Sequence, residues 1–251
     1  MTMDLSEIKI LFFDIGNVFV SDDPSGCYGY RSLYEHLASE GVQMAVDQFF
    51  AKRTEHVRAG GNLWTFVAAH VPRHEFTEFQ TRVRAEMYSR WPEMSPEVPE
   101  MRKAAEELSS HYRLGIIANQ PREVRALLDE RRLLPLFEVV AISDELELEK
   151  PEHGIFEWAL AEAQVRPEEA MMIGDRIDND IKPAKALQMR TLWLRLGHEG
   201  RGWEPKDEFE QCYAWSLGEV NFSEVEPKTP QEAPDLIARS AEELVQLLKQ
   251  P

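Results

Sequence analysis

Residues 12–18 read Phe12-Phe13-Asp14-Ile15-Gly16-Asn17-Val18, and this stretch decides the fold. It closes an apolar run from Ile8 to Phe13 that only Lys9 interrupts. The β-branched and aromatic content of that run predicts a strand covered on both faces. Asp14 then stands where a parallel strand delivers side chains to a cleft. A carboxylate there serves as a nucleophile, a metal ligand, a turn former or a helix cap, and the stretch alone leaves these roles open.

Further apolar runs along the chain predict more strands with helices between them. Strands are expected over residues 113–118, 137–142, 170–173 and 190–196. Residues 121–134 and 151–165 carry apolar side chains at helical spacing, and residues 235–248 predict a terminal helix or a strand followed by a helix. The alternation predicts an α/β fold with a Rossmann-like, mostly parallel sheet.

Residues 21–99 differ from the rest because they lack convincing strands. Amphipathic helical runs are expected at 32–38, 46–57 and 75–88, with breaks at Gly60-Gly61 and in the Pro-rich segment 91–99. We therefore predict an all-helical subdomain over residues 21–99, inserted into an α/β core formed by residues 1–20 and 100–251. The acidic segment 197–234, rich in Gly, Pro and Trp, predicts no particular element.

Composition limits the possible partners. The net charge is −17, from 45 acidic and 28 basic residues, so the chain has no basic surplus to neutralise a nucleic-acid backbone. The same charge repels a free phosphate ester, and an anionic substrate therefore needs local lysine, arginine or a divalent metal. Apolar runs stay short of membrane-spanning length, so no membrane partner is expected.

The first seven residues and the cysteines predict a cytoplasmic location. Residues 1–7 lack the basic region and long apolar segment of a secretory signal. Cys27 and Cys212 lie far apart and form no metal-ligand pattern, which favours free thiols. A monomer or a homodimer is consistent with this sequence.

Polar residues follow several of the predicted strands. Asn119 comes directly after the second strand, and Lys150 precedes a helix expected to begin at Pro151. Asp175, Asp178 and Asp180 follow the fourth strand and a glycine. Helix capping and the helix dipole explain one or two acids there, whereas three within six residues suit a hard divalent cation such as Mg²⁺.

Four motifs in order resemble those of the haloacid dehalogenase-like hydrolase superfamily. They are Asp14-Ile15-Gly16-Asn17-Val18, Ile117-Ala118-Asn119, Lys150-Pro151, and Gly174-Asp175 followed by Asp180. The resemblance covers roughly residues 6–20 and 100–200, and the predicted helical insertion falls where this family places its type C1 cap. It implies a phosphatase-type member with the family's Rossmann-like core.

The resemblance also implies a mechanism. Asp14 would attack a phosphoryl group, and water would then hydrolyse the aspartyl-phosphate. Mg²⁺ would be held by Asp14, the carbonyl oxygen of Gly16 and Asp175, with Asp180 as a further ligand or a residue that orients one. Lys150 would neutralise the phosphoryl charge and Asn119 would orient the phosphoryl oxygens. The implied substrate is a small phosphorylated metabolite.

Two positions depart from the family pattern. Phosphatases of this family usually carry a second aspartate where this chain has Gly16, and such general acid–base help contributes roughly 10²- to 10⁴-fold in rate. A branch with a first motif much like Asp-Leu-Gly-Asn-Val nevertheless contains phosphatases. The second departure is Ala118, where a phosphate-binding Ser or Thr is usual.

Other functions remain compatible with the motifs. Gly16 and Ala118 suit a catalytically weakened binding or regulatory protein. Dehalogenation of a 2-haloacid by Asp14 is a further alternative, against which the acids Asp175 and Asp180 argue. A phosphoryl-accepting receiver domain is set aside, because there the acid pair stands near the first strand and the lysine near the last.

Substrate selection is expected to come from the helical insertion. Aromatic side chains at helical spacing more often form a helical core, and arginines are more often solvated surface charges. With that alternative open, the candidate cleft residues are Tyr28, Tyr30, Arg31, His56, Arg58 and Trp64. Asp22 and Asp23 begin the insertion, and we hypothesise that one of them replaces the missing acid.

Overall fold

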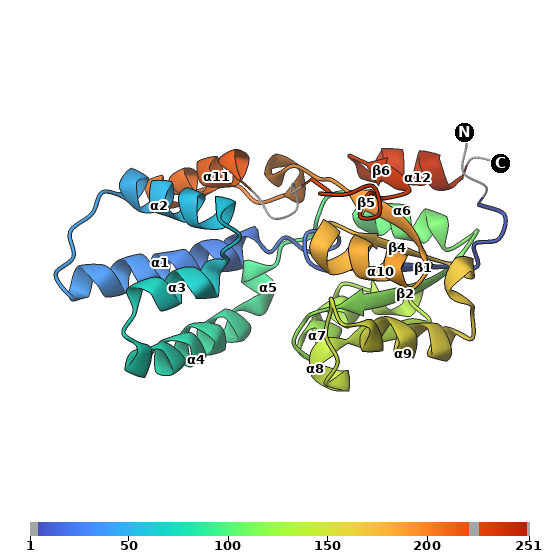
Figure 1. Ribbon diagram of the computed structural model, residues 1–251, viewed down its shortest axis with the longest axis horizontal. Helices are drawn as coiled ribbons and strands as arrows, with labels where there is room; N and C mark the ends of the chain where they lie inside the picture. Colours follow the sequence, from blue (N-terminus) through green and yellow to red (C-terminus); the bar gives the residue numbers. More distant parts are fainter. Residues whose placement is uncertain (1–4, 221–225, 250–251) are drawn as a thin grey trace. The chain divides into compact units, whose positions relative to one another are not determined.

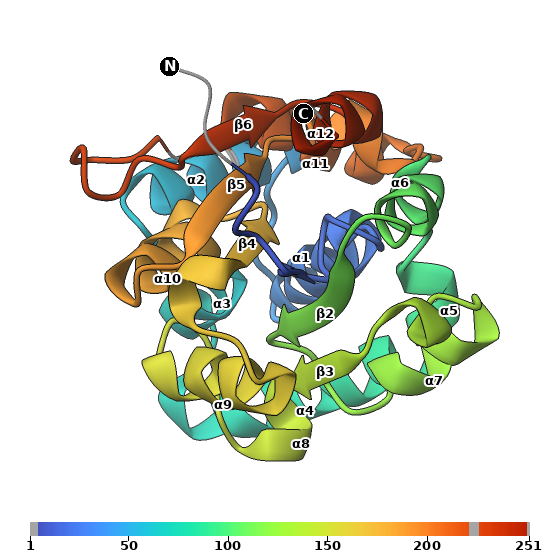
Figure 2. The ribbon, with the colours of Figure 1, turned by 90° about the vertical axis from the view of Figure 1, so that its right-hand side faces the viewer.

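Six parallel strands form one sheet in the order β3-β2-β1-β4-β5-β6 (Figures 1 and 2). The structure is a computed structural model that describes residues 5–220 and 226–249, so residues 1–4 of the N-terminal stretch lie outside it. The strands are β1 (Ile10–Phe13), β2 (Arg113–Ala118), β3 (Val139–Ile142), β4 (Ala170–Gly174), β5 (Arg190–Leu194) and β6 (Leu236–Ala238). The predicted Rossmann-like α/β fold is confirmed.

The first strand lies in the middle of the sheet, between β2 and β4. Phe13 is in register with Ile116 of β2 and with Ile173 of β4. The Asp14 N–H continues the ladder by donating to the Ile173 carbonyl at 2.9 Å. Because all the strands are parallel, the residues that follow β1, β2 and β4 emerge at the same edge of the sheet.

Helices cover both faces of this sheet, and Figure 2 shows them on its two sides. On one face, α9 (His153–Ala163) and α10 (Lys182–Ala186) pack on a cluster that includes Phe12, Ile117 and Met172. On the other face lie α6 (Met101–Leu108) and α12 (Ala241–Leu248), which contact each other. Shorter elements complete this part of the chain: α7 (Val124–Glu130), α8 (Ser143–Leu146), the π-helical turn η3 (Ile177–Ile181), and the 3₁₀ turns η1 (Leu134–Leu136), η2 (Pro167–Glu169) and η4 (His198–Arg201).

The chain divides into two compact units. The core unit comprises Met1–Val20, Glu97–Arg201 and Ser223–Pro251, and the helical unit comprises Ser21–Pro96 and Gly202–Phe222. Helices of the second unit are α1 (Asp23–Ser39), α2 (Val46–Arg58), α3 (Leu63–His70), α4 (Arg73–Ser89), α5 (Trp91–Met94) and α11 (Glu208–Glu219).

Helix α11 joins the helical unit although it follows β5 in the chain, and Figure 1 shows it alongside α2. Phe209 and Tyr213 of α11 are buried in the aromatic core of this unit. The buried Arg53 guanidinium of α2 donates to the Ser216 carbonyl at 2.8 Å and to the Val220 carbonyl at 3.1 Å, at the end of α11. Residues 202–220, which the sequence predicts to lie in the core, belong instead to the helical unit, because contacts with residues about 160 positions earlier hold them there.

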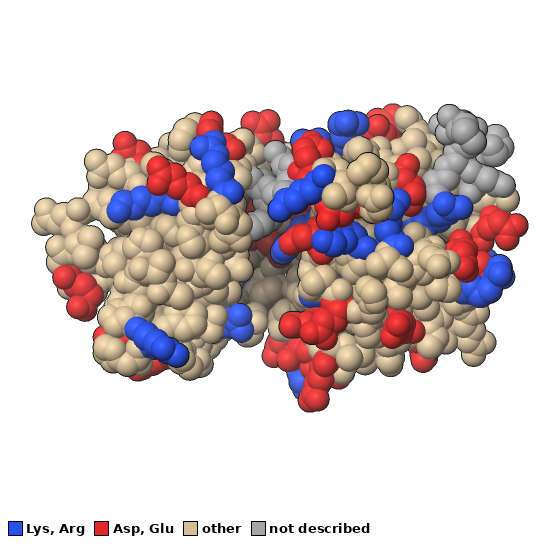
Figure 3. Space-filling view, viewed as in Figure 1, with Lys and Arg blue, Asp and Glu red and all other residues tan. Residues whose placement is uncertain are grey.

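Charged side chains of both signs share the surface. On the face shown in Figure 3, lysine and arginine lie among aspartate and glutamate over both units. Among the described residues, no helix combines the length and the apolar character needed to cross a membrane.

Candidate active site

Asp14 lies at the carboxyl end of the central strand β1 and is only 8% exposed. Its Oδ1 accepts a hydrogen bond from its neighbour Ile15 N–H at 2.8 Å. The same oxygen lies 2.9 Å from Lys150 Nζ. Both contacts are made by Oδ1, so this oxygen is restrained. The described residues provide no hydrogen bond to the other oxygen, Oδ2.

Two further carboxylates follow β4, next to the end of β1. Asp175 comes directly after the strand, and Asp180 lies in the π-helical turn η3. The Asp180 side chain folds back over Gly174, where an added Cβ would overlap Asp180 Oδ2. The Arg176 N–H donates to the same Oδ2 at 3.0 Å. Glycine at 174 therefore provides the space in which Asp180 is held.

The three carboxylates form one buried cluster. One oxygen from each of Asp14, Asp175 and Asp180 lies within 4.8 Å of the others. Burial, followed by the charges of Asp180 and Asp14, raises the pKa of Asp175 to about 8. Burial also raises the pKa of Asp180, to about 6, although the Lys150 charge opposes this. Such groups titrate together, and their raised pKa values reflect burial together with the crowding of negative charge.

Lys150 supplies the positive charge within this cluster. Its side chain is fully buried, with Nζ 2.6 Å from Asp180 Oδ1 and 2.9 Å from Asp14 Oδ1. Burial alone lowers the pKa of this ammonium, but the charges of Asp14 and Asp180 outweigh burial and raise it. Lys150 therefore stays protonated and connects the carboxylate after β1 with the one after β4.

Asn119, which follows β2, faces the main chain of Lys150. Its Nδ2 donates to the Lys150 carbonyl at 2.7 Å, and its Oδ1 accepts from the Lys150 N–H at 2.7 Å. The structure thus brings together Asp14, Asn119, Lys150, Asp175 and Asp180. Their chemical roles stay predictions.

Three further residues, to which the sequence assigned no site role, contact Asp175 or lower its pKa. Asn17 Nδ2 donates to Asp175 Oδ2 at 3.2 Å, and the Trp193 indole N–H donates to the Asp175 carbonyl at 2.8 Å. The charge of the buried Arg201 partly offsets the rise in the pKa of Asp175. Asn17 belongs to the first motif, in which the sequence assigns it no role of its own, and it adopts a φ of 53°; Trp193 and Arg201 lie in no recognisable pattern.

The remaining candidates lie elsewhere. Asp178 pairs with the Arg176 guanidinium at 2.6 Å and is outside the carboxylate cluster. Gly16, beside Asp14, and Ala118, at the end of β2, are both buried. Asp22 immediately precedes α1 and Asp23 begins it, within the helical unit, and their proposed part in proton transfer stays a prediction.

Several side chains proposed for substrate selection have partners inside the helical unit. Tyr30 is buried in its aromatic core, and Arg31 is paired with Asp207 at 2.7 Å. Arg58 is paired with Glu219 at 3.0 Å, and the Arg84 guanidinium stacks on Trp64. Tyr28 packs partly buried against the same core, and His56 lies 2.8 Å from the Thr65 hydroxyl. Both cysteines are free, as expected.

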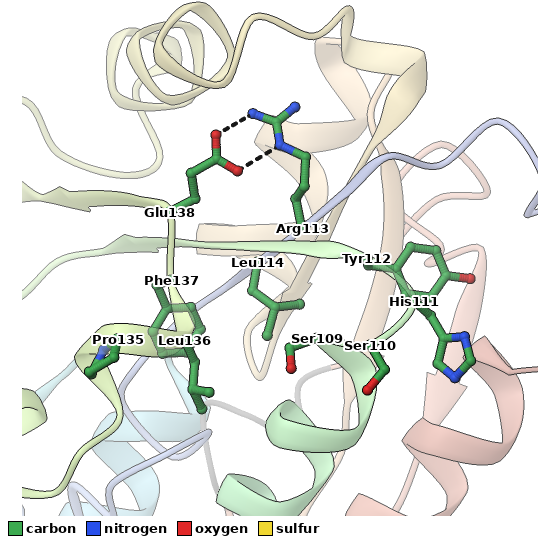
Figure 4. A pocket seen from close by; sticks show the side chains of 10 residues that line it. All are labelled: Ser109, Ser110, His111, Tyr112, Arg113, Leu114, Pro135, Leu136, Phe137 and Glu138. Carbon is green, nitrogen blue, oxygen red and sulfur yellow. Dashed lines mark hydrogen bonds and ion pairs between the residues drawn. The ribbon is translucent and has the colours of Figure 1, made fainter.

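A surface pocket of about 460 Å³ lies at the other end of β2, away from these carboxylates (Figure 4). Residues 109–114 and 135–138 line it. The Arg113 guanidinium there donates two hydrogen bonds to Glu138, at 2.6 and 2.7 Å. Because this cation is already neutralised, the pocket offers little to a phosphorylated ligand.

The carboxylate cluster has the chemistry of a site for a divalent metal ion. Its ligand atoms are carboxylate oxygens, which hard cations prefer. Three carboxylates face one ammonium, so a cation would relieve the remaining negative charge. The buried aspartates therefore fit a metal ion.

Comparison with known proteins agrees with this arrangement. Residues 29–194 match the family model of haloacid dehalogenase-like hydrolases. A glyceraldehyde 3-phosphate phosphatase of Pyrococcus furiosus is 28% identical over 200 residues, which cover 77% of this chain and 83% of that protein.

Solved structures share the fold. A haloacid dehalogenase-like phosphatase of Thermococcus onnurineus superposes with a TM-score of 0.59 at 21% identity, over 96% of this chain and 98% of that one. A 2-haloacid dehalogenase of Pseudomonas syringae superposes with a TM-score of 0.55 at 20% identity, with the same coverage of 96% and 98%. Because a phosphatase and a dehalogenase both match, the fold does not select the reaction.

Proposed function

This chain belongs to the haloacid dehalogenase-like hydrolase family, and from that membership we propose that it is a Mg²⁺-dependent phosphomonoesterase for a small phosphorylated metabolite. One observation carries the proposal: Asp14, Asp175 and Asp180 form a buried cluster in which Lys150 bridges Asp14 and Asp180. The phosphatase relative from Pyrococcus furiosus supports a small phosphorylated substrate.

Asp14 is the proposed nucleophile. Because Ile15 N–H and Lys150 both hold Oδ1, the attack falls to Oδ2, which forms the bond to phosphorus as the ester bond breaks. Water then cleaves the aspartyl-phosphate and regenerates the carboxylate. Lys150, kept protonated by its two aspartates, places positive charge beside Oδ1, the other oxygen of the attacking carboxylate.

Mg²⁺ bound by Asp14, Asp175 and the Gly16 carbonyl, with Asp180 as a ligand or a support, would supply the charge that lets a carboxylate approach a phosphate dianion. Asn17 and Trp193 hold Asp175 by its side chain and by its carbonyl, so that carboxylate is oriented before any cation binds.

Proton transfer to the leaving group is the step for which the first motif lacks a side chain. Gly16 stands where the family's phosphatases usually carry an acid, and such acids contribute roughly 10²- to 10⁴-fold. A good leaving group, as in a sugar 1-phosphate or an acyl phosphate, reduces the need for this proton. We therefore propose substrates of that kind.

Phosphate release from aryl phosphates of graded leaving-group pKa tests this function. With Mg²⁺ we expect turnover that falls steeply as the leaving group worsens, and with EDTA we expect none. Turnover that persists undiminished in EDTA would contradict the metal requirement. A flat dependence would show that another residue supplies the proton.

A second function, a weakened binding or regulatory protein, is favoured by Gly16 and Ala118 together. It predicts no turnover on any ester, with ligand binding that calorimetry detects without Mg²⁺. A 2-haloacid dehalogenase is disfavoured by the acidic cluster, and release of chloride in EDTA would revive it.

A further inference from the structure

The Asn119 side chain is engaged with the main chain of a single residue. Its carboxamide donates to the Lys150 carbonyl and accepts from the Lys150 N–H, each at 2.7 Å. Two short hydrogen bonds from one planar group fix both the position and the orientation of the Lys150 backbone. Asn119 thus ties the end of β2 to the loop that carries the lysine.

Leu148 of that loop packs against the apolar core, and among the described residues the hydrogen bonds from a side chain to the Lys150 main chain come from Asn119. The loop runs from Glu147, in a left-handed conformation with φ of 55°, to the start of α9 at His153. The hydrogen bond from the Glu152 N–H to the Glu149 carbonyl, at 3.0 Å, lies within the loop itself. Because the loop lies outside the sheet ladder, the Asn119 carboxamide links it to a strand that adjoins β1.

A precise backbone matters because the lysine side chain is long and its target is narrow. Nζ lies at the end of four methylene groups and contacts Asp180 at 2.6 Å and Asp14 at 2.9 Å. A shift of the backbone by 1 Å would break one of these contacts or force the stem to refold within a closed space. Among the described residues, the Lys150 ammonium is the side-chain cation that contacts both Asp14 and Asp180 directly.

We propose that Asn119 is a positioning residue for Lys150 and that it contributes to catalysis through Lys150, without depending on a contact to the phosphoryl group. The catalytic part of this inference rests on the proposed phosphatase function. The structural part, that Asn119 holds Lys150 in place, does not. This changes the role expected from the motif, which assigned Asn119 to the phosphoryl oxygens.

Amine labelling tests the structural part without any measurement of activity. Acetic anhydride is applied to the wild type and to Asn119→Ala, and peptide mass spectrometry gives the modification rate at Lys150. Lys103, whose side chain is 74% exposed, is the internal reference. Ser240→Ala is the matched control, because it removes one hydrogen bond to the main chain, from Glu243 N–H, elsewhere in the core unit.

We expect Lys150 to be protected in the wild type and in Ser240→Ala. In Asn119→Ala its labelling, relative to Lys103, should rise about tenfold or more, since two hydrogen bonds of ordinary strength are lost. Equal protection in Asn119→Ala and the wild type would overturn the proposal. A circular dichroism spectrum unchanged by the substitution distinguishes local release of Lys150 from unfolding.

A double-mutant cycle tests the catalytic part. The values of kcat and KM for p-nitrophenyl phosphate are compared among the wild type, Asn119→Ala, Lys150→Met and the double variant. If Asn119 acts through Lys150, the double variant matches Lys150→Met, and the loss in Asn119→Ala falls mainly on kcat. If the losses in kcat/KM of the two single variants multiply in the double variant, and Asn119→Ala also raises KM in the Lys150→Met background, Asn119 contacts the phosphoryl group directly. That result would overturn the proposal. An inactive wild type would remove the proposed function, while the labelling result would still stand.

Discussion

The ends of β4 and β2 flank Asp14 on either side, and they are equipped very differently. The end of β4 presents two buried carboxylates: Arg176 N–H donates to Asp180 in the space beside Gly174, and Asn17 donates to Asp175, whose carbonyl accepts from Trp193. The end of β2 presents the methyl group of Ala118 and an asparagine turned toward a backbone.

This difference shows how charge is distributed around Asp14. Negative charge is concentrated on the β4 side, where burial and like charges raise the pKa of Asp175 and Asp180. Positive charge from a side chain reaches Asp14 through one lysine, carried by a loop that Asn119 of the β2 side holds. We infer that this site depends more strongly on a bound cation than a site that carries a phosphate-binding Ser or Thr at position 118.

Among changes to the surroundings of Asp14, crowding the β4 side should have the largest effect. In Gly174→Ala the new methyl group would overlap the Asp180 carboxylate, so Asp180 must leave its contacts with Lys150 and Arg176. We expect phosphate release to fall about 10- to 100-fold, in line with the loss of a group that supports a metal ligand. Gly197→Ala, where an added Cβ meets nothing within 4 Å, is the control. Activity equal to that of the control would show that Asp180 is dispensable.

Adding an acid beside Asp14 should have the next largest effect, and a selective one. Gly16→Asp supplies the carboxyl group that the first motif lacks, so esters with poor leaving groups should gain about tenfold or more. Aryl phosphates with good leaving groups should change little, and the dependence on leaving-group pKa should flatten. A parallel change for all esters would mean that proton transfer is not the limiting step.

The carboxylates predict a pH dependence of stability in metal-free protein. Their folded-state pKa values, about 8 for Asp175 and about 6 for Asp180, exceed the ordinary value of 3.8. The folded state therefore binds more protons, and this contribution is complete below pH 4 and lost as pH rises through 6 to 8.

Mg²⁺ binding should restore the stability of the folded state that is lost when these carboxylates deprotonate. A Mg²⁺ concentration of 100 times its Kd at pH 8 should raise Tm by about 5 °C at that pH. The same concentration should raise Tm by less at pH 5.5, where protons compete for the carboxylates. Thermal unfolding in EDTA and in MgCl₂ at both pH values checks this. Equal shifts at the two pH values, or a larger shift at pH 5.5, would contradict the raised pKa values.

The smallest expected effect lies on the β2 side. Ala118→Ser adds a hydroxyl where the family usually has one, and a hydrogen bond to a charged phosphoryl group should lower KM by up to about tenfold. Ala126→Ser, on an exposed position of α7, should leave KM unchanged. A rise in KM for Ala118→Ser would mean that the hydroxyl finds no partner at the end of β2.

Much of this site was predictable because its residues follow apolar strands. Asp14, Asn119 and Asp175 each come directly after a strand in the sequence, and parallel pairing then brings them to one edge. Lys150 was predictable only through the motif that contains it. The Arg201 and Trp193 side chains near Asp175 gave no local signal, because their proximity depends on how β5 and the turn after it pack.

Dependence on contacts between distant positions also limited the prediction of the helical unit from the sequence. The segment containing α11 is acidic and rich in Gly, Pro and Trp, which masks a helix whose aromatic residues Phe209 and Tyr213 pack against another segment. The short strand β6 follows Asp235, which binds Thr191 of β5 through its side chain. Such contacts between distant positions decide where these elements belong, and local patterns do not encode them.

The nucleophile itself gives the most direct test of this account. Phosphate release should be measured with Mg²⁺ for the wild type, Asp14→Asn and the control Asp129→Asn, whose carboxylate is exposed on α7. We predict that Asp14→Asn loses at least about four orders of magnitude while the control keeps full activity. Equal phosphate release by the wild type and Asp14→Asn across a broad panel of esters would contradict the central claim.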